Sequence, residues 1–242
     1  MARRAEANAG LDIIPIPRFL SGDLTSLLCS RALPASFFLL VALAKLQSLA
    51  NFVAQASPAQ TAMDTLGFYA ACLHRLAGVV FMALVVAFFI VRLNPVRSSR
   101  NLVHIVVALL GSFMMTVVAV APMHGASNSL TVIATVIMVA GTAITAAALL
   151  FLRRSFSITP EARQLVTKGM YSFVRHPMYL GEILGSLGMV LLAISPFTVS
   201  IFALFVLLQI KRMDYEERIL QQAFPDYGRY KRQTARLIPG VY

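Results

Sequence analysis

The sequence predicts an all-α integral membrane protein with about six transmembrane helices, and three observations support this fold class. First, 58% of the residues are hydrophobic and 13% are charged, and the mean hydropathy of +0.76 is typical of proteins with several membrane spans. Second, the apolar residues come in runs of roughly 20, the length of helix that crosses a hydrocarbon core of about 30 Å. Third, nearly all the basic residues lie between these runs.

Six apolar segments are the candidate spans. The first four are each long enough to cross a bilayer as a helix, and they are Leu33–Phe52, Leu66–Val91, Leu102–Ala121 and Leu130–Leu152. The last two, Met178–Ile194 and Phe197–Ile210, are shorter, and only Ser195 and Pro196 separate them. We therefore expect these two segments to form a short helical hairpin whose ends return to the same side of the membrane.

The basic residues predict the orientation, because loops rich in Lys and Arg stay in the cytoplasm. Of the 21 Lys and Arg residues, all but Lys45 and Arg75 fall on one side of this arrangement. The loops Val53–Thr65 and Pro122–Ser129 contain neither residue and are expected outside. The segments expected inside are residues 1–32, Arg92–Asn101, Arg153–Pro177 and Lys211–Tyr242. Both termini are then cytoplasmic, and we expect the bacterial inner membrane rather than the endoplasmic reticulum.

The chain is expected to divide into three regions. Residues 1–32 form a cytoplasmic or interfacial segment, in which Leu11–Leu28 lies along the membrane surface. Residues 33–152 form a four-span membrane region. Residues 153–242 combine the helical hairpin with a cytoplasmic amphipathic helix and carry most of the polar chemistry.

The charge and the cysteine count exclude several function classes. A net charge of +11 at pH 7 would suggest a nucleic-acid partner for a soluble domain. Here the basic residues flank apolar spans, so membrane lipids are the expected partners and nucleic acid is not. Cys29 and Cys72 show no metal-ligand spacing, and the four histidines show no HExxH pattern. No metal site is expected.

Residues Leu165–Tyr179 form the first cluster of polar chemistry, and they contain the sequence Arg175-His176-Pro177. Pro177 suits the first position of a helix, where its missing N–H would be unpaired anyway, and the proline pushes His176 towards an extended conformation. The helix that follows opens with free backbone amides and the positive end of its dipole. Arg175 and His176 could therefore hold the carboxylate of a cofactor or substrate. The alternative is that Arg175 only sets topology and His176 is a polar cap.

Tyr179, Glu182 and Ser186 share one face of that helix. Glu182 would be an ionised group within a span, which is costly unless it is paired or solvated. It either contacts a cationic or hydroxyl-bearing ligand or forms a salt bridge with Lys45 or Arg75. The same helix carries a GxxxG pattern, which favours close packing against another helix.

The second cluster is the amphipathic helix predicted for Arg212–Phe224. Helical rotation gives it an apolar stripe formed by Met213, Ile219, Leu220, Ala223 and Phe224. Glu216 projects into the middle of the stripe, Glu217 borders it, and Arg212 lies four residues before Glu216 on the same side. An Arg–Glu pair on an apolar face indicates a buried ion pair or a ligand site. The alternative is an ordinary i,i+4 pair on a helix surface.

The two clusters contain several motifs in a fixed order. They are Gly169-x-Tyr171-x-x-x-Arg175-His176-Pro177-x-Tyr179, an apolar hairpin, Glu216-Glu217-x-x-Leu220, Phe224-x-x-Tyr227-x-x-Tyr230 and Arg236-Leu237-Ile238-Pro239. Together they resemble the isoprenylcysteine carboxyl methyltransferase family over about residues 150–242. The resemblance implies a membrane-embedded methyltransferase that takes S-adenosylmethionine from the cytoplasm and a lipidic or small apolar acceptor laterally from the membrane.

The resemblance also implies roles for single residues. The implied cofactor-binding residues are Tyr171, Arg175, His176, Pro177, Tyr179 and Glu217, and Glu182 joins them as a ligand contact. Arg212 and Glu216 are the implied catalytic residues beside the acceptor. A prenylcysteine-type carboxylate, which the family favours, would pair with Arg212, whose guanidinium Glu216 would orient. An amine or thiol acceptor would instead use Glu216 as base or charge partner.

Two alternatives remain at this point. The Gly181-Glu182 pair also resembles the helix start of NADPH-dependent sterol and steroid reductases of membranes. Those enzymes usually carry Trp in their C-terminal motif, whereas this chain has none, and Phe224–Tyr227 fits the methyltransferase pattern better. The second alternative is a non-enzymatic transporter or assembly factor with Lys45, Arg75 and Glu182 along a path through the membrane.

Overall fold

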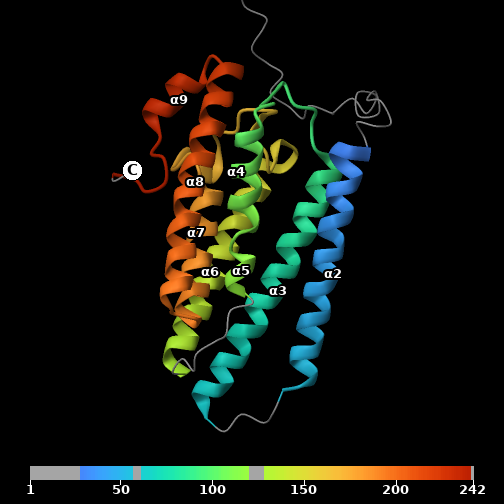
Figure 1. Cartoon of the computed structure of the whole chain (residues 1–242), viewed down its shortest axis with the longest axis vertical. Helices are drawn as coiled ribbons and strands as arrows, with labels where there is room; N and C mark the ends of the chain where they lie inside the picture. Colours follow the sequence, from blue (N-terminus) through green and yellow to red (C-terminus); the bar gives the residue numbers. More distant parts are fainter. Residues whose placement is uncertain (1–27, 57–60, 120–127, 241–242) are drawn as a thin grey trace, which may run out of the picture.

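The computed structural model describes residues 28–56, 61–119 and 128–240 and shows a bundle of long helices (Figure 1). Within the described residues, four helices are long and apolar enough to cross a membrane, and two further apolar helical segments, Leu102–Val118 and Pro177–Leu192, are shorter. The helical membrane class is thus confirmed. The predicted interfacial segment Leu11–Leu28 lies outside the described residues, except for Leu28.

The first two spans, α2 (Leu33–Ala54) and α3 (Ala62–Val91), pack side by side as a pair (Figure 1). A single π-helical turn, η2 (Leu28–Ala32), leads into α2. At the start of α3, the Thr61 hydroxyl accepts from the Asp64 amide and the Asp64 carboxylate accepts from the Thr61 amide. This capping box satisfies two backbone donors and begins the helix sharply.

The third expected span, Leu102–Ala121, is interrupted in the structure. It consists of α4 (Leu102–Phe113) and a single further turn, α5 (Thr116–Ala119). The Thr116 hydroxyl donates to the Phe113 carbonyl at 2.6 Å, so a side chain competes with the backbone ladder at the break. The expectation of one continuous helix was wrong here.

Close helix packing joins α6 (Asn128–Leu152) to α7 (Pro177–Leu192). A Cβ atom added to Gly181 would lie 2.7 Å from the carbonyl oxygen of Gly141, and one added to Gly141 would lie 2.6 Å from the Cα atom of Gly185. No larger side chain fits at these positions. The packing predicted from the GxxxG pattern is confirmed, with α6 as the partner helix.

The last helix, α8 (Pro196–Ala223), is one continuous helix of 28 residues. It contains both the expected span Phe197–Ile210 and the expected amphipathic helix from Arg212, because no Gly or Pro interrupts residues 197–223. Ser195 begins it with a capping box to Thr198. The hairpin turn is therefore where it was predicted, but the prediction that both of its helices are short was wrong.

The end of the bundle that carries α9 in Figure 1, called the loop end below, also holds the short elements. These are β1 (Arg97–Ser98), which pairs antiparallel with β2 (Glu161–Ala162), η3 (Arg153–Ser155), η4 (Gly169–Ser172) and α9 (Tyr227–Gln233). Gly169 has a φ of 64°, and a Cβ atom there would overlap the ring of Phe151. Glycine is required at the start of η4 for both reasons.

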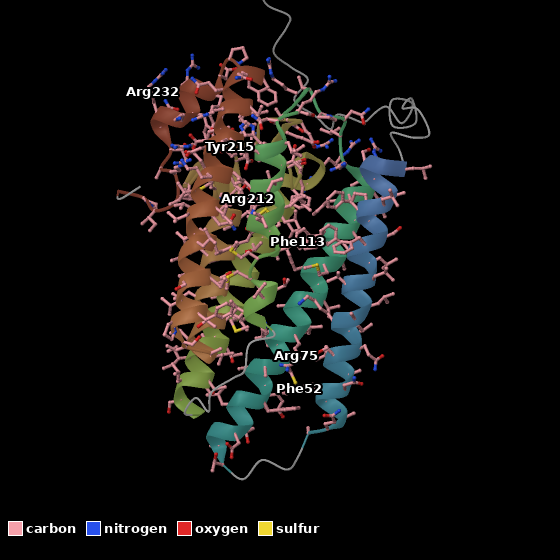
Figure 2. All side chains as sticks on the ribbon, in the orientation of Figure 1. Phe52, Arg75, Phe113, Arg212, Tyr215 and Arg232 are labelled. Atoms are coloured by element: carbon pink, nitrogen blue, oxygen red, sulfur yellow. The ribbon has the colours of Figure 1, made fainter. Side chains whose placement is uncertain are left out.

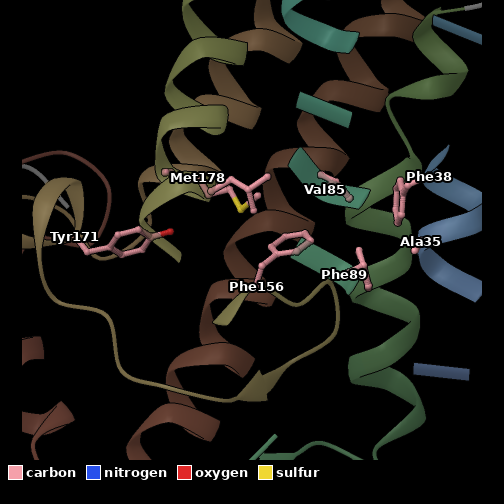
Figure 3. Packing of buried hydrophobic residues seen from close by; sticks show 9 residues of the cluster. Ala35, Phe38, Val85, Phe89, Phe156, Tyr171 and Met178 are labelled. Atoms are coloured by element: carbon pink, nitrogen blue, oxygen red, sulfur yellow. The ribbon is translucent and has the colours of Figure 1, made fainter. Parts of the chain in front are cut away.

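A cluster of buried hydrophobic residues connects α2 and α3 to the loop end (Figure 3). The rings of Phe38 and Phe89 stack with centroids 5.5 Å apart, and Phe156 meets Phe89 edge-on at 5.5 Å. Tyr171 and Met178 complete this cluster from the segment around α7. The first two spans therefore form one wall of the region beneath the loop end.

Candidate active site

A cavity of about 330 Å³ lies where this hydrophobic cluster meets the polar residues of α7 and α8. Its apolar part is lined by residues that include Phe37, Phe38, Phe81, Val85 and Phe113. Its polar part contains Tyr171, Arg175, His176, Tyr179, Glu182, Arg212 and Glu216. All the site residues predicted from the sequence line the cavity except Pro177 and Glu217, which are buried beside it.

Glu217 lies at the centre of a cluster of cationic groups. Its Oε1 atom is 3.0 Å from both Arg175 Nε and His176 Nε2, and 3.4 Å from Arg236 Nε. Its Oε2 atom is 2.9 Å from Lys231 Nζ. Because a carboxylate accepts hydrogen bonds, His176 carries its proton on Nε2 in this arrangement. Glu217 thus holds Arg175 and His176, which themselves line the cavity.

The backbone brings the two clusters together at this point. The Arg175 amide donates to the Ala235 carbonyl at 2.8 Å, and the His176 amide donates to the Arg236 carbonyl at 3.1 Å. Pro177 begins α7 as expected, but His176 has φ −129° and ψ 56°, short of a fully extended conformation. The His176 side chain caps no helix amide and bonds Glu217 instead, so the interpretation of His176 as a cap was wrong.

A second group of polar contacts links α7 to α8 beside the cavity. The Tyr179 hydroxyl donates to Glu216 Oε2 at 2.9 Å, and the Arg212 guanidinium carbon lies 4.9 Å from the centroid of the Tyr179 ring. Arg212 donates to Gln209 Oε1 at 2.6 Å and to Glu182 Oε2 at 3.4 Å. Gln209 in turn donates to Glu182 Oε2 at 2.5 Å. These five contacts fix the positions of the carboxylates and the guanidinium.

Two expected pairings are corrected by this geometry. Glu182 pairs with Arg212, so the interpretation of Glu182 as a partner of Lys45 or Arg75 was wrong. Arg212 was expected to pair with Glu216 along one helix, whereas its salt bridge crosses from α8 to α7. The reason is Gln209, which lies one turn before Arg212 and holds both the guanidinium and Glu182.

Glu216 and Glu217 exchange the environments predicted for them. Glu217 is only 4% exposed, whereas Glu216 is intermediate and lines the cavity. The rotation of α8 alone placed Glu216 in the middle of the apolar stripe and Glu217 at its border. The segment after α9 folds over the Glu217 side and supplies Arg236, a tertiary contact that the rotation of a single helix does not show.

A smaller cavity of about 40 Å³ lies on the side of α9 and β2. Tyr171, Arg175, His176 and Glu216 line both this cavity and the larger one. The Tyr230 hydroxyl donates to the Tyr171 carbonyl at 2.6 Å. Burial raises the pKa of Tyr171 and of Tyr230 above the ordinary value for tyrosine, so both phenols stay neutral. These four residues, called the polar ring below, lie between the small cavity and the larger, mainly apolar one.

Gln209 and Lys231 are site residues that the sequence analysis did not identify. Gln209 is fully buried and is the only amide side chain in the apolar run 197–210. This isolated polar residue could have been identified from the sequence. Lys231 is basic in a basic segment, so nothing in the sequence distinguishes it from its neighbours.

Residues 122–227 match the phospholipid methyltransferase family. The cobalt-zinc-cadmium resistance protein CzcN of Cupriavidus metallidurans is 38% identical over 76 residues, which are 31% of this chain and 35% of that protein. Protein-S-isoprenylcysteine O-methyltransferase B of Arabidopsis thaliana is 35% identical over 80 residues, 33% of this chain and 39% of that protein. The solved structure of the eukaryotic intramembrane Ras methyltransferase ICMT has a TM-score of 0.47 and 18% identity, over 73% of this chain and 68% of that one.

The resemblance found in the sequence is confirmed by the family match and the Arabidopsis relative. The family match begins earlier than expected, at residue 122, and ends before Arg236-Leu237-Ile238-Pro239. The curated matches cover little more than a third of those relatives' own lengths. None of these comparisons favours a sterol or steroid reductase, a transporter or an assembly factor.

Proposed function

We propose, from the match of residues 122–227 to the phospholipid methyltransferase family, that this chain is a membrane-embedded methyltransferase. It transfers the methyl group of S-adenosylmethionine to a lipidic or small apolar acceptor, with a prenylcysteine-type carboxylate favoured. The observation that carries the proposal is the polar ring with a cavity on each side. Two cavities that meet at the same polar residues would let a water-soluble methyl donor and an apolar methyl acceptor reach one reaction centre separately.

The polar residues present suit the groups of S-adenosylmethionine and of an anionic acceptor. Arg212 Nε is buried and has no hydrogen-bond partner within the described residues, which leaves a charged donor for the carboxylate of the acceptor. Glu216 uses Oε2 to accept from Tyr179, and its Oε1 suits a ligand ammonium or hydroxyl group. Arg175 and His176 add further hydrogen-bond donors for S-adenosylmethionine, and Glu217 holds both side chains in place.

The apolar part of the cavity suits the chain of a lipidic acceptor. Phe37, Phe38, Phe81, Val85 and Phe113 line it from α2, α3 and α4. Ligand pockets are typically apolar with a few placed polar groups that fix orientation. In this proposal the first two spans, which the family match does not cover, supply the acceptor's binding surface.

Methyl transfer requires little covalent chemistry from the protein. Bound S-adenosylmethionine would supply an activated methyl group on its sulfonium sulfur. Arg212 would hold an acceptor carboxylate by an ion pair, and Glu182 and Gln209 would fix the guanidinium. Holding the reactants in near-attack geometry can supply several kcal/mol of barrier reduction, about 7 to 11 in favourable cases. A carboxylate acceptor needs no base, whereas a neutral amine or thiol would transfer a proton to Glu216.

Ligand-induced stabilisation tests the proposed function. We expect S-adenosylhomocysteine to raise the thermal unfolding midpoint of the purified chain in detergent, because a ligand that binds only the folded state stabilises it. NADPH should give no shift. A shift with NADPH alone would support a reductase, and no shift with either ligand would favour a non-enzymatic protein.

The proposed cytoplasmic location of the site predicts a labelling pattern. Single cysteines at Gln55 and Ser98, which are both exposed, would be compared after Cys29 and Cys72 are replaced by alanine. An impermeant maleimide should label Gln55→Cys from outside the inner membrane and Ser98→Cys only after that membrane is permeabilised. The reverse pattern would place the polar ring on the outer side.

A further inference from the structure

A second large cavity, which Glu182 also lines, lies between α3 and α7. Its volume is about 310 Å³. It shares residues with the cavity of the candidate active site, namely Lys45, Phe81, Met82, Ser112 and Glu182. The residues that belong to the second cavity and not to the first include His74, Arg75, Met115, Met138, Met189 and Phe205.

Three basic side chains gather at this cavity from α2 and α3. A Cβ atom added to Gly78 would lie 3.7 Å from Lys45 Nζ, so the ammonium group rests against α3 one turn from His74. His74 Nδ1 is buried and has no hydrogen-bond partner within the described residues. Arg75 lies 3.9 Å from the centroid of the Phe52 ring, and Figure 2 places both far from the loop end that carries Arg232.

These basic groups lack a carboxylate partner. Among the ion pairs of residues 28–56, 61–119 and 128–240, none includes Lys45 or Arg75. Glu182 lines the same cavity, but Arg212 and Gln209 already occupy its Oε2 atom. Cations inside a bilayer are costly unless they are paired or solvated. The cavity therefore has an excess of positive charge that an anionic ligand group would neutralise.

The depth and lining of the cavity indicate what kind of anion enters. Arg75 lies roughly 20 Å along α3 from Ala62, at about 1.5 Å per residue, which is well inside a hydrocarbon core. Four methionines line the cavity, and they are Met82, Met115, Met138 and Met189. Methionine is flexible and adapts to irregular apolar ligands. A molecule that joins an apolar chain to an acidic group would match both the methionines and the basic side chains that line the cavity.

We propose that Lys45, His74 and Arg75 bind the carboxylate or phosphate group of an amphiphile whose chain lies among the methionine and phenylalanine side chains of the second cavity. The inference stands on the charges and the cavity and does not depend on methyl transfer. Because the two cavities share five lining residues, the chain of this ligand would reach towards the candidate active site.

Binding of simple amphiphiles to the full-length protein in a neutral detergent tests this proposal. Thermal unfolding, followed by the loss of helical circular dichroism, would be measured with dodecyl phosphate, dodecanol and inorganic phosphate. We expect dodecyl phosphate to raise the midpoint more than dodecanol does, and inorganic phosphate to leave it unchanged. Equal shifts with dodecyl phosphate and dodecanol would overturn the anion site. A shift with inorganic phosphate alone would show a free anion to be the occupant and would overturn the amphiphile.

Matched variants locate the effect. Lys45→Gln/Arg75→Gln should bind dodecyl phosphate at least tenfold more weakly, whereas Lys211→Gln/Arg218→Gln removes two exposed charges from α8 and should bind it as wild type does. Arg75→Gln alone repeats the measurement if the double variant does not fold, with Arg75→Lys expected to retain binding. Unchanged affinity in Arg75→Gln would refute the site. S-adenosylhomocysteine is titrated separately, so failure of the proposed methyltransferase leaves this result standing.

Discussion

Replacing Arg212 with alanine is expected to lower the rate of methyl transfer by about 100- to 1,000-fold, the usual cost of losing one fixed donor at a reacting centre. Arg212 is 5% exposed, lines the cavity and carries a buried Nε atom without a partner. Its loss should reduce kcat for a carboxylate acceptor more than it reduces affinity for S-adenosylhomocysteine. Both quantities can be measured on purified protein with a radioactive methyl donor.

The matched control for Arg212 is Arg218→Ala, because Arg218 is on the same helix but exposed. It should retain wild-type turnover. Loss of Arg212 also leaves Glu182 without its ion pair, so Arg212→Ala/Glu182→Gln is needed to separate a folding defect from a catalytic one. Wild-type turnover in Arg212→Ala would refute its role at the acceptor.

Replacing Glu217 with alanine is expected to lower the free energy of unfolding by about 3 to 5 kcal/mol, the cost of removing one partner of a buried ion pair. Glu217 is the common partner of Arg175, His176, Lys231 and Arg236. Without it, the positive charges of Arg175 and Arg236, whose side chains are little exposed, would lose the carboxylate that they share. Thermal unfolding in detergent measures the loss.

The neighbouring residue provides the control for Glu217. Glu216→Gln keeps the shape of a side chain that lines the cavity, and it should change stability little while weakening S-adenosylhomocysteine binding. Glu217→Ala should show the opposite balance, with the larger effect on stability. If Glu216→Gln proves the more destabilising change, the assignment of the two glutamates to structure and to ligand binding is reversed.

The helices were predictable because their signals are local. Pro177 at a helix start and the Ser195-Pro196 turn both depend on neighbouring residues, and the structure reproduces both of them. The break between α4 and α5 was not predicted, because Leu102–Ala121 is a largely apolar run. At the break, the hydroxyl of a single threonine, Thr116, bonds the Phe113 carbonyl. The continuity of α8 was missed for the opposite reason, since a change from apolar to charged composition does not end a helix that has no Gly or Pro.

The residues that make up the site were predictable from the sequence, but the partners with which they form ion pairs were less so. Arg175, His176 and the two glutamates stand out as polar residues at membrane boundaries. Their partners depend on how α7, α8 and the segment after α9 meet, and this is tertiary information. Rotation around α8 alone could not show that residues 234–236 cover Glu217, nor that Glu182 on α7 is nearer to Arg212 than Glu216 is.

The pairing of Val174 and Arg175 with Ala235 has a consequence for biosynthesis. Residues 231–236 follow all the long apolar helices in the chain, so they are synthesised after the helices that they cover. A polypeptide truncated after α8 would keep these helices, while Arg175 and His176 would lack the segment that positions them. Competence would then be acquired only once this late segment has folded back onto α7 and α8.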